Sequence, residues 1–254
     1  MSTTWITEVM SKTRLYVEGP LATAADLEVS GEVARYIGRV LRLRPGDAVI
    51  LFDGSGAEFP AVVNRLSKAS VGLSVNERID RSVESSLEIH LLQGISRGER
   101  MDLVIQKATE LGVARITPLL TEYSVVRLDP NRAEKRLHHW SGVAKSACEQ
   151  CGRNVLPAIE APATLLSWLG EHHEHRGMRV ILKPGAPDTC RSLTPDDSEL
   201  IVLVGPEGGF SDAEYAFAEA EGFRAIGLGP RVLRTETAAL AVLAALQTLH
   251  GDLA

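Results

Sequence analysis

Three glycine-bearing segments hold the residues best suited to chemistry, and each follows a short apolar run. They are 183–185 (KPG), 205–209 (GPEGG) and 229–234 (GPRVLR). The preceding runs have the composition of buried strands, and ligands of open α/β sheets bind beyond the carboxyl ends of such strands. Glycine lets a ligand approach backbone N–H and C=O groups without a Cβ in the way. The sequence therefore predicts a ligand site built from these three loops.

The GPEGG loop leads directly into a helix start, because Ser211 and Glu214 form a capping-box pattern. A strand, a glycine loop and a helix N-terminus also build phosphate sites. This loop, however, lacks the basic and hydroxyl pair of a Walker loop and the GxGxxG spacing of a dinucleotide fold. Glu207 would repel a pyrophosphate, so a neutral or cationic ligand fits better. A tight turn that binds nothing is the alternative.

The last predicted helix has charged residues at its start and apolar residues along the rest of its length. Residues 238–246 are apolar on all sides, which predicts a helix buried on several faces, with Thr235 as its N-cap. Arg231, Arg234 and Glu236 stand at its start. Such an entrance indicates a functional site, and a structural ion pair is the competing interpretation.

From residue 87 onward the pattern alternates between strands and helices. Residues 87–95 are expected to form a strand, 99–112 a helix that Gly112 ends, and 113–121 a second strand. A strand, a helix and a strand in this order imply a parallel sheet. Further helices are expected over 130–151, 162–170, 211–222 and 235–251, and further strands over 178–183, 199–205 and 223–229. We therefore expect an α/β domain over residues 87–254.

Residues 1–86 have a different pattern, with short strands around one helix. Strands are expected over 13–19, 48–54, 58–67 and 69–79, and a helix over 31–41. Many short strands in so few residues predict a small β-barrel domain, which we place at residues 1–80. The polar stretch 80–86 is the expected linker.

Composition limits how the chain could bind nucleic acid. The 254 residues carry a formal net charge of −6, and neither expected domain is basic overall. RNA contacts would therefore have to come from local clusters. Arg35, Arg39, Arg42 and Arg44 form the best such cluster, and a solvated helix face explains them equally well.

The cysteines and the apolar runs indicate a reducing compartment. Three cysteines are too few for a disulfide framework. Cys148 and Cys151 form a CxxC motif, but no second ligand pair stands at a suitable spacing, so we expect no metal. The cluster 171–175 (EHHEH) is interpreted as a solvated helix end. We also expect neither a secretory signal nor a membrane span, and hence a cytoplasmic protein.

The chain contains the segments GPEGGF, LGPRVLRTETA and GERMDLVIQKATELGV. In these segments it resembles the RsmE-type 16S ribosomal RNA uridine methyltransferases of the SPOUT superfamily. ACEQCGRNVLP resembles the glutamine-glycine-arginine segment of that family, and VLRLRPGD its N-terminal signature. The resemblance covers nearly the whole chain. Tyr36-Ile37 stand where the family often has histidine, and Tyr123 where it commonly has arginine, so details of RNA contact are expected to differ.

The resemblance implies an N-terminal PUA-like barrel, a C-terminal SPOUT domain with a parallel sheet and a deep trefoil knot, and a homodimer with each cofactor pocket near the subunit boundary. It implies S-adenosylmethionine as the cofactor, held mainly by backbone groups. Carried onto this chain, the cofactor-binding residues are Leu182, Gly205, Glu207, Gly208, Leu228, Gly229, Val232 and Leu233.

The implied reaction is methylation of N3 of a uridine in 16S ribosomal RNA of the small subunit. This nitrogen must lose its proton to become a nucleophile. Arg234 is the expected stabiliser of the uracil anion, and Glu236 the expected proton acceptor.

The target base must be unstacked to present N3, and the substrate is expected to be RNA in an assembled small subunit. Arg100 and Arg153 could instead be partners in internal salt bridges. The expected RNA-binding residues are Arg14, Arg42, Arg44, Arg97, Arg100 and Arg153. A ribose 2′-O methyltransferase of the same superfamily and a non-catalytic ribosome-assembly factor are the alternative functions.

Overall fold

The computed structural model describes residues 13–124, 129–172, 177–195 and 199–253, and it divides into two compact units. The first comprises the described residues through Glu84 together with Cys148–Leu156. The second comprises Ser85–Ala147 and the described residues from Pro157 onward. Residues 148–156, which the expected boundaries assign to the second domain, thus group with the first unit.

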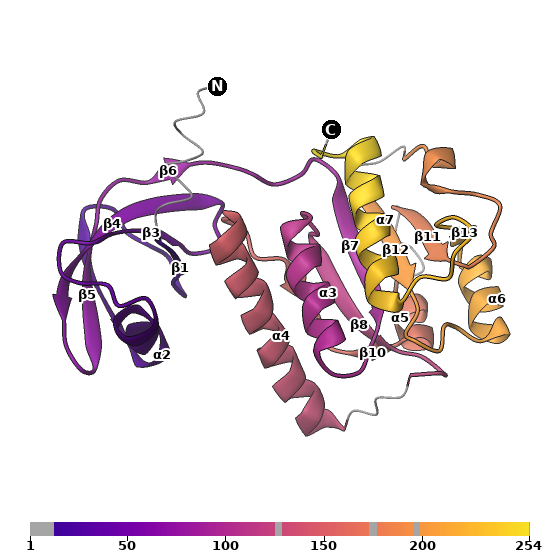
Figure 1. Ribbon diagram of the computed structural model, residues 1–254, viewed down its shortest axis with the longest axis horizontal. Coiled ribbons are helices and arrows are strands. Elements are labelled where there is room, and N and C mark those ends of the chain that lie inside the picture. The colour runs from indigo at the N-terminus through magenta and orange to yellow at the C-terminus, as the bar shows by residue number, and fades with distance from the viewer. Residues whose placement is uncertain (1–12, 125–128, 173–176, 196–198, 254) are drawn as a thin grey trace. The chain divides into compact units, whose positions relative to one another are not determined.

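The first unit is a mostly antiparallel sheet (Figure 1). Its strands are β1 (Thr13–Tyr16), β2 (Ala25–Ser30), β3 (Ala48–Phe52), β4 (Ala57–Leu66), β5 (Ser70–Val75) and β6 (Ile79–Asp80). The order is β1-β3-β4-β5-β2, with β6 beside β4, and only the pair β1–β3 is parallel. The predicted elements do not include β2, although its six residues alternate between apolar and polar; only Val29 among them is buried.

The helix expected over 31–41 is two short elements. Residues Gly31–Arg35 form the α-helix α2, and Tyr36–Val40 form a π-helical turn in which the Leu41 amide donates to the Tyr36 carbonyl at 3.0 Å. Ile37 is fully buried as expected, but Val40, expected on the same apolar face, is 65% exposed. The wider turn moves Val40 away from the face of Ile37.

The second unit is built on a fully parallel sheet, as predicted. Its strands are β7 (Glu88–Gly94), β8 (Arg115–Leu120), β9 (Ala158–Ile159), β10 (Ala163–Thr164), β11 (Met178–Leu182), β12 (Glu199–Val204) and β13 (Arg224–Ile226). The order is β10-β8-β7-β12-β11-β13, with β9 beside β8. The trefoil knot is an implication of the resemblance.

The sheet has a hydrophobic core on each face because its strands are apolar on both sides. Along β12, Leu200 and Val202 pack into one core, and Ile201 and Leu203 into the other. The first core includes residues of three helices, α3 (Glu99–Glu110), α4 (Pro130–Cys151) and α7 (Thr235–His250). The second includes residues of α5 (Leu165–Glu171) and α6 (Asp212–Ala220) (Figure 1).

Start and stop signals in the sequence account for most helix ends. Helix α3 ends before Gly112, whose φ is +78°, and α4 ends before Gly152, whose φ is +89°. Ser211 and Glu214 form the predicted capping box of α6. The prediction of Thr235 as an N-cap is wrong: Arg234 holds that position, and the Thr235 hydroxyl donates to the Gly205 carbonyl at 2.6 Å.

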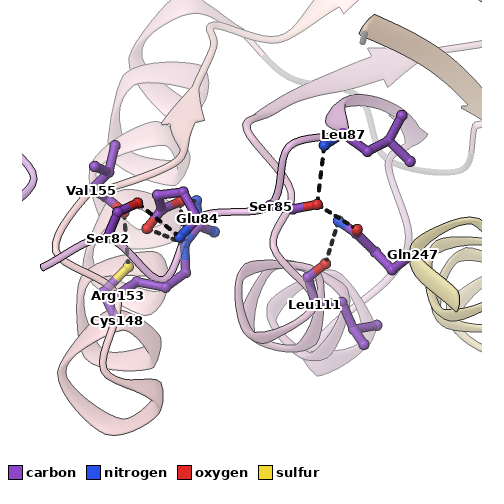
Figure 2. Close-up of polar contacts among 9 residues, drawn as sticks. All are labelled: Ser82, Glu84, Ser85, Leu87, Leu111, Cys148, Arg153, Val155 and Gln247. Atoms are coloured by element: carbon purple, nitrogen blue, oxygen red, sulfur yellow. Dashed lines mark hydrogen bonds and ion pairs between the residues drawn. The ribbon is translucent and has the colours of Figure 1, made fainter. Parts of the chain in front are cut away.

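Figure 2 shows polar contacts on the two sides of the division at residues 84 and 85. In the first unit, Nε of Arg153 donates to Glu84 Oε2 at 2.9 Å. In the second unit, the Ser85 hydroxyl donates to Gln247 Oε1 at 2.7 Å, and Gln247 Nε2 donates to the Leu111 carbonyl at 3.1 Å. The expected linker therefore takes part in side-chain contacts of both units.

None of the helices that the structure describes combines the length and the apolar composition that a membrane-spanning helix requires.

Candidate active site

A pocket of about 450 Å³ lies in the second unit, where loops follow β11 and β12 and where α7 begins. This volume lies within the range of small-molecule sites. It is the edge of the sheet at which the sequence predicts a ligand. The lining residues are Arg100, Leu182, Pro184, Val204, Gly205, Pro206, Glu207, Gly209, Tyr215, Val232, Leu233, Arg234, Thr235, Glu236 and Ala238.

A smaller hollow of about 60 Å³ shares part of this lining. Leu182 and Leu233 line both spaces, whereas Leu228 and Gly229 line only the smaller one. Seven of the eight residues expected to bind the cofactor thus line one of the two spaces or both.

Gly208, the eighth, lines neither space. A Cβ at this position would lie 2.7 Å from Cβ of Tyr123, so the missing side chain makes room for that residue. Gly205 is also close-packed, since a Cβ there would lie 3.1 Å from Cα of Gly209. The two glycines let the loop fold tightly against its neighbours.

Tyr215, which was not predicted, also lines the pocket. Its hydroxyl donates to the Leu182 carbonyl at 3.3 Å, and its ring meets Phe210 edge-on at 5.5 Å between centroids. Burial raises the pKa of the Tyr215 hydroxyl, and the charge of Glu214 raises it further. The available signal was its place in the first turn of the helix that the GPEGG loop begins.

Glu207 is held by groups from the start of α3. The Arg97 amide donates to its Oε1 at 3.1 Å, and Arg100 Nη1 donates to the same oxygen at 2.8 Å. Burial acts to raise the pKa of Glu207, but the amides of Glu207 and Arg97 and the Arg100 guanidinium outweigh it and lower that pKa. Glu207 is therefore ionised at neutral pH and contributes a negative charge to the pocket.

Glu236 lies on the first turn of α7, with its side chain 13% exposed. Its Oε1 is 3.9 Å from Arg100 Nε. Its Oε2 is buried and makes no hydrogen bond with any described residue. Arg234, the N-cap of the same helix, is exposed and lines the pocket. The structure therefore brings both expected catalytic residues to one space and adds Arg100 beside them.

The residues expected to contact RNA divide into buried and exposed groups. Arg14 is 6% exposed and pairs with Glu58 at 2.8 Å, and Arg153 is 4% exposed and pairs with Glu84. Both guanidinium groups stabilise the interior of the first unit, so neither offers a surface to RNA. The exposed or half-exposed members are Arg42, Arg44, Arg97 and Arg100.

The CxxC motif has no reactive thiol at Cys148. This side chain is fully buried, its thiol donates to the Val155 carbonyl at 3.6 Å, and burial raises its pKa to about 12. Among the described residues no group of histidine, cysteine or carboxylate side chains could hold a metal. His173, Glu174 and His175 of the EHHEH cluster lie outside the described residues.

Comparison with known proteins identifies the family. The family model described as an RNA methyltransferase domain matches residues 83–247, which include the whole pocket. The chain belongs to this family. A second model, described as an RNA methyltransferase PUA domain, matches residues 29–74.

Curated relatives extend the match along the chain. The ribosomal RNA small subunit methyltransferase E of Buchnera aphidicola (subspecies Acyrthosiphon pisum) is 35% identical and covers 94% of each chain. The protein of the same name from Bacillus subtilis is 30% identical over 90% of this chain and 94% of its own.

Solved structures give the same result. The Neisseria gonorrhoeae enzyme of that name, bound to S-adenosylmethionine, has a TM-score of 0.88 and 35% identity over 96% of this chain and all of its own. A Legionella pneumophila protein in complex with the same cofactor has a TM-score of 0.91 and 41% identity over 95% and 99% of the two chains. The α/β domain and the PUA-like domain that the sequence predicts are thus confirmed.

Proposed function

We propose that this protein transfers the methyl group of S-adenosylmethionine to N3 of a uridine in 16S ribosomal RNA. The observation that carries the proposal is the pocket, in which three glycine-bearing loops and the first turn of α7 surround one space. The family of the chain, and two similar proteins solved with this cofactor, support the choice of ligand.

The lining of the pocket suits a methyl donor that carries a positive charge and no phosphate. Leu182, Val232 and Leu233 offer apolar surface for an adenosine, and the loop backbone offers hydrogen bonds. Glu207 and Glu236 add negative charge. The bound cofactor would supply an electrophilic methyl group on a sulfonium. The residues that would hold it are the eight that the resemblance implies, with Tyr215 added, and Gly208 would act by shaping the loop.

The protein groups have distinct tasks in this reaction. The N3–H of the uracil must be lost as the new N–C bond forms, and Glu236, which lines the pocket, would accept that proton. Arg234, exposed at the rim, would stabilise the charge that develops on the uracil oxygens. Arg100, whose Nε lies 3.9 Å from Glu236 Oε1, would orient the Glu236 side chain.

Exposed arginines of the first unit would bind the RNA backbone. Arg35, Arg39, Arg42 and Arg44 are all exposed on or after the segment that begins with α2. These four arginines lie within residues 29–74, the stretch that the PUA model matches. Phosphate contacts of this kind would make RNA binding fall with added salt. Tyr36, 38% exposed in the same segment, would offer a ring for stacking.

The substrate would be RNA folded in an assembled small subunit, because an acidic chain binds poorly to RNA through charge alone. A homodimer, as the resemblance implies, is part of the same proposal.

Two measurements test the function. Calorimetry of the purified protein with S-adenosylmethionine should show binding, and an absence of binding would favour a non-catalytic assembly factor. Mass spectrometry of nucleosides in small-subunit RNA should show 3-methyluridine only when cells contain this protein. A lost 2′-O-methyl nucleoside in its place would reject uridine N3 as the target.

A further inference from the structure

A fully buried glutamine lies at the end of β7, beside the strand that leads into the GPEGG loop. Gln93 pairs in register with Val204, the last residue of β12, and is 0% exposed. A buried polar side chain in the middle of an apolar sheet is costly unless its hydrogen bonds are used. Gln93 lines neither pocket, so it does not touch a ligand there directly.

The amide of Gln93 donates two hydrogen bonds. Nε2 donates to the Gly94 carbonyl at 3.0 Å and to the Thr235 hydroxyl at 2.9 Å. Because a carbonyl only accepts, the contact with Gly94 fixes which end of the amide is the nitrogen. Oε1 of Gln93 is buried and makes no hydrogen bond with any described residue. The side chain therefore acts here as a donor.

Thr235 connects Gln93 to the GPEGG loop by hydrogen bonds. Its hydroxyl has one hydrogen, which it donates to the Gly205 carbonyl at 2.6 Å, while the oxygen accepts from Gln93. The direction of each bond is thereby set. The chain of contacts joins the end of β7, the first residue of the loop and the first residue of α7, and Gly205 and Thr235 both line the pocket.

We infer that Gln93 and Thr235 are positioning residues that hold the Gly205 carbonyl in place and so set the backbone lining of the cofactor site. This inference rests on the proposed function. Gln93 affects the site indirectly, because it sets the direction in which the Thr235 hydroxyl donates. Thr235 affects the site through its hydrogen bond to Gly205, the first residue of the loop. The GPEGG loop and the first turn of α7, which both line the pocket, are thus joined by a side-chain hydrogen bond.

Substitutions of Thr235 isolate the hydroxyl. Thr235→Val keeps the shape of the side chain but leaves the Gly205 carbonyl without its donor, and Thr235→Ser keeps the hydroxyl. We expect Thr235→Val to weaken S-adenosylmethionine binding by about tenfold or more, and Thr235→Ser to restore it to within about threefold of the wild type.

Substitutions of Gln93 test the direction of the bonds. The carboxylate of Gln93→Glu cannot donate, so it would draw the Thr235 hydrogen away from Gly205. Gln93→Met removes the polar end and keeps the length. Both should raise the cofactor dissociation constant, by about tenfold for the glutamate, and should raise KM for the cofactor more than they lower kcat.

Gln247 provides a matched control. It is also 0% exposed and also donates from Nε2 to a carbonyl, that of Leu111, while its Oε1 accepts from a hydroxyl, that of Ser85 (Figure 2). It lies on the same helix as Thr235 but about 18 Å further along, and it lines neither pocket. Gln247→Glu and Gln247→Met should lower thermal stability and leave cofactor affinity unchanged.

Calorimetry with S-adenosylmethionine, with thermal unfolding of each variant, decides the matter. If Thr235→Val binds the cofactor as tightly as Thr235→Ser, or if the Gln247 variants lose as much affinity as those of Gln93, the inference is overturned. If Gln93→Glu does not fold, the two Thr235 variants still decide. A wild-type protein that binds no cofactor would overturn the proposed function, and this inference with it.

Discussion

Gly94, the last residue of β7, meets the start of the GPEGG loop so closely that one added methyl group should displace that loop. A Cβ at Gly94 would lie 2.4 Å from the backbone nitrogen of Pro206 and 2.8 Å from the carbonyl carbon of Gly205, whereas ordinary contacts begin at 3.4 Å. The atoms that block it belong to backbone and to a proline ring, so no flexible side chain can yield. The Gly94→Ala variant would therefore have to move the loop by about 1 Å.

The magnitude follows from that displacement. Overpacking of this kind costs about 1–3 kcal/mol, and a misplacement of about 1 Å in a binding site can lower activity by about a hundredfold. We expect Gly94→Ala to weaken S-adenosylmethionine binding by about tenfold to a hundredfold, as measured by calorimetry. Urea unfolding should show a loss of free energy of unfolding of about 1–3 kcal/mol.

Gly142→Ala is the matched control. Gly142 is exposed in the interior of α4, and a Cβ there meets no described atom within 4 Å. Alanine should stabilise this helix by up to about 1 kcal/mol and leave cofactor binding unchanged. A Gly94→Ala protein with wild-type affinity and stability would refute the argument, because it would mean that the loop does not need its contact with β7.

Four further predictions concern charged groups. Glu236→Gln should lower the methylation rate by about a hundredfold or more while cofactor affinity is retained, and full turnover would eliminate Glu236 as the proton acceptor. Arg14→Ala should lower the free energy of unfolding by about 1.5–3 kcal/mol, because it removes one of the two ion pairs of the buried Glu58 and leaves that with Arg81. Arg42→Ala, at an exposed position, should instead change stability by less than about 0.5 kcal/mol and reduce the salt dependence of RNA binding; equal destabilisation by both would contradict the assignment. The pKa of Glu207 is lower in the folded than in the unfolded state, so its ionised form stabilises the fold at pH values above the unfolded pKa. This contribution is lost as pH falls through the folded pKa. The free energy of unfolding in urea should therefore depend less on pH for Glu207→Gln than for the wild type between about pH 5 and 3.

Local signals in the sequence were enough to predict most elements around the pocket. Helix α4 begins and ends where it was predicted, because Pro130 suits a first turn and Gly152 a helix stop. The Ser211 and Glu214 pair located α6, and the apolar runs located β11 and β12. The sequence alone therefore places the loops between these elements at one edge of a parallel sheet.

Contacts between residues far apart in the chain could not be predicted in this way. Arg14 looked like a surface residue because its partner Glu58 stands 44 positions away. Gln93 is one letter in an apolar strand, and only the fold places Thr235, 142 residues later, beside it. Periodic patterns relate residues that are only a few positions apart. They therefore carry no information about pairs that lie far apart in the sequence.

The first unit is discontinuous in sequence, and this affects how the protein is made. Its strands come from residues before Glu84, yet Asn154, whose Nδ2 donates to the Arg81 carbonyl at 2.9 Å, reaches the ribosomal exit more than sixty residues later. During synthesis the N-terminal sheet must therefore wait for Cys148–Leu156 before its interior is complete. A fragment ending at Glu84 should be less stable than the same fragment with a peptide of residues 148–156 added in trans.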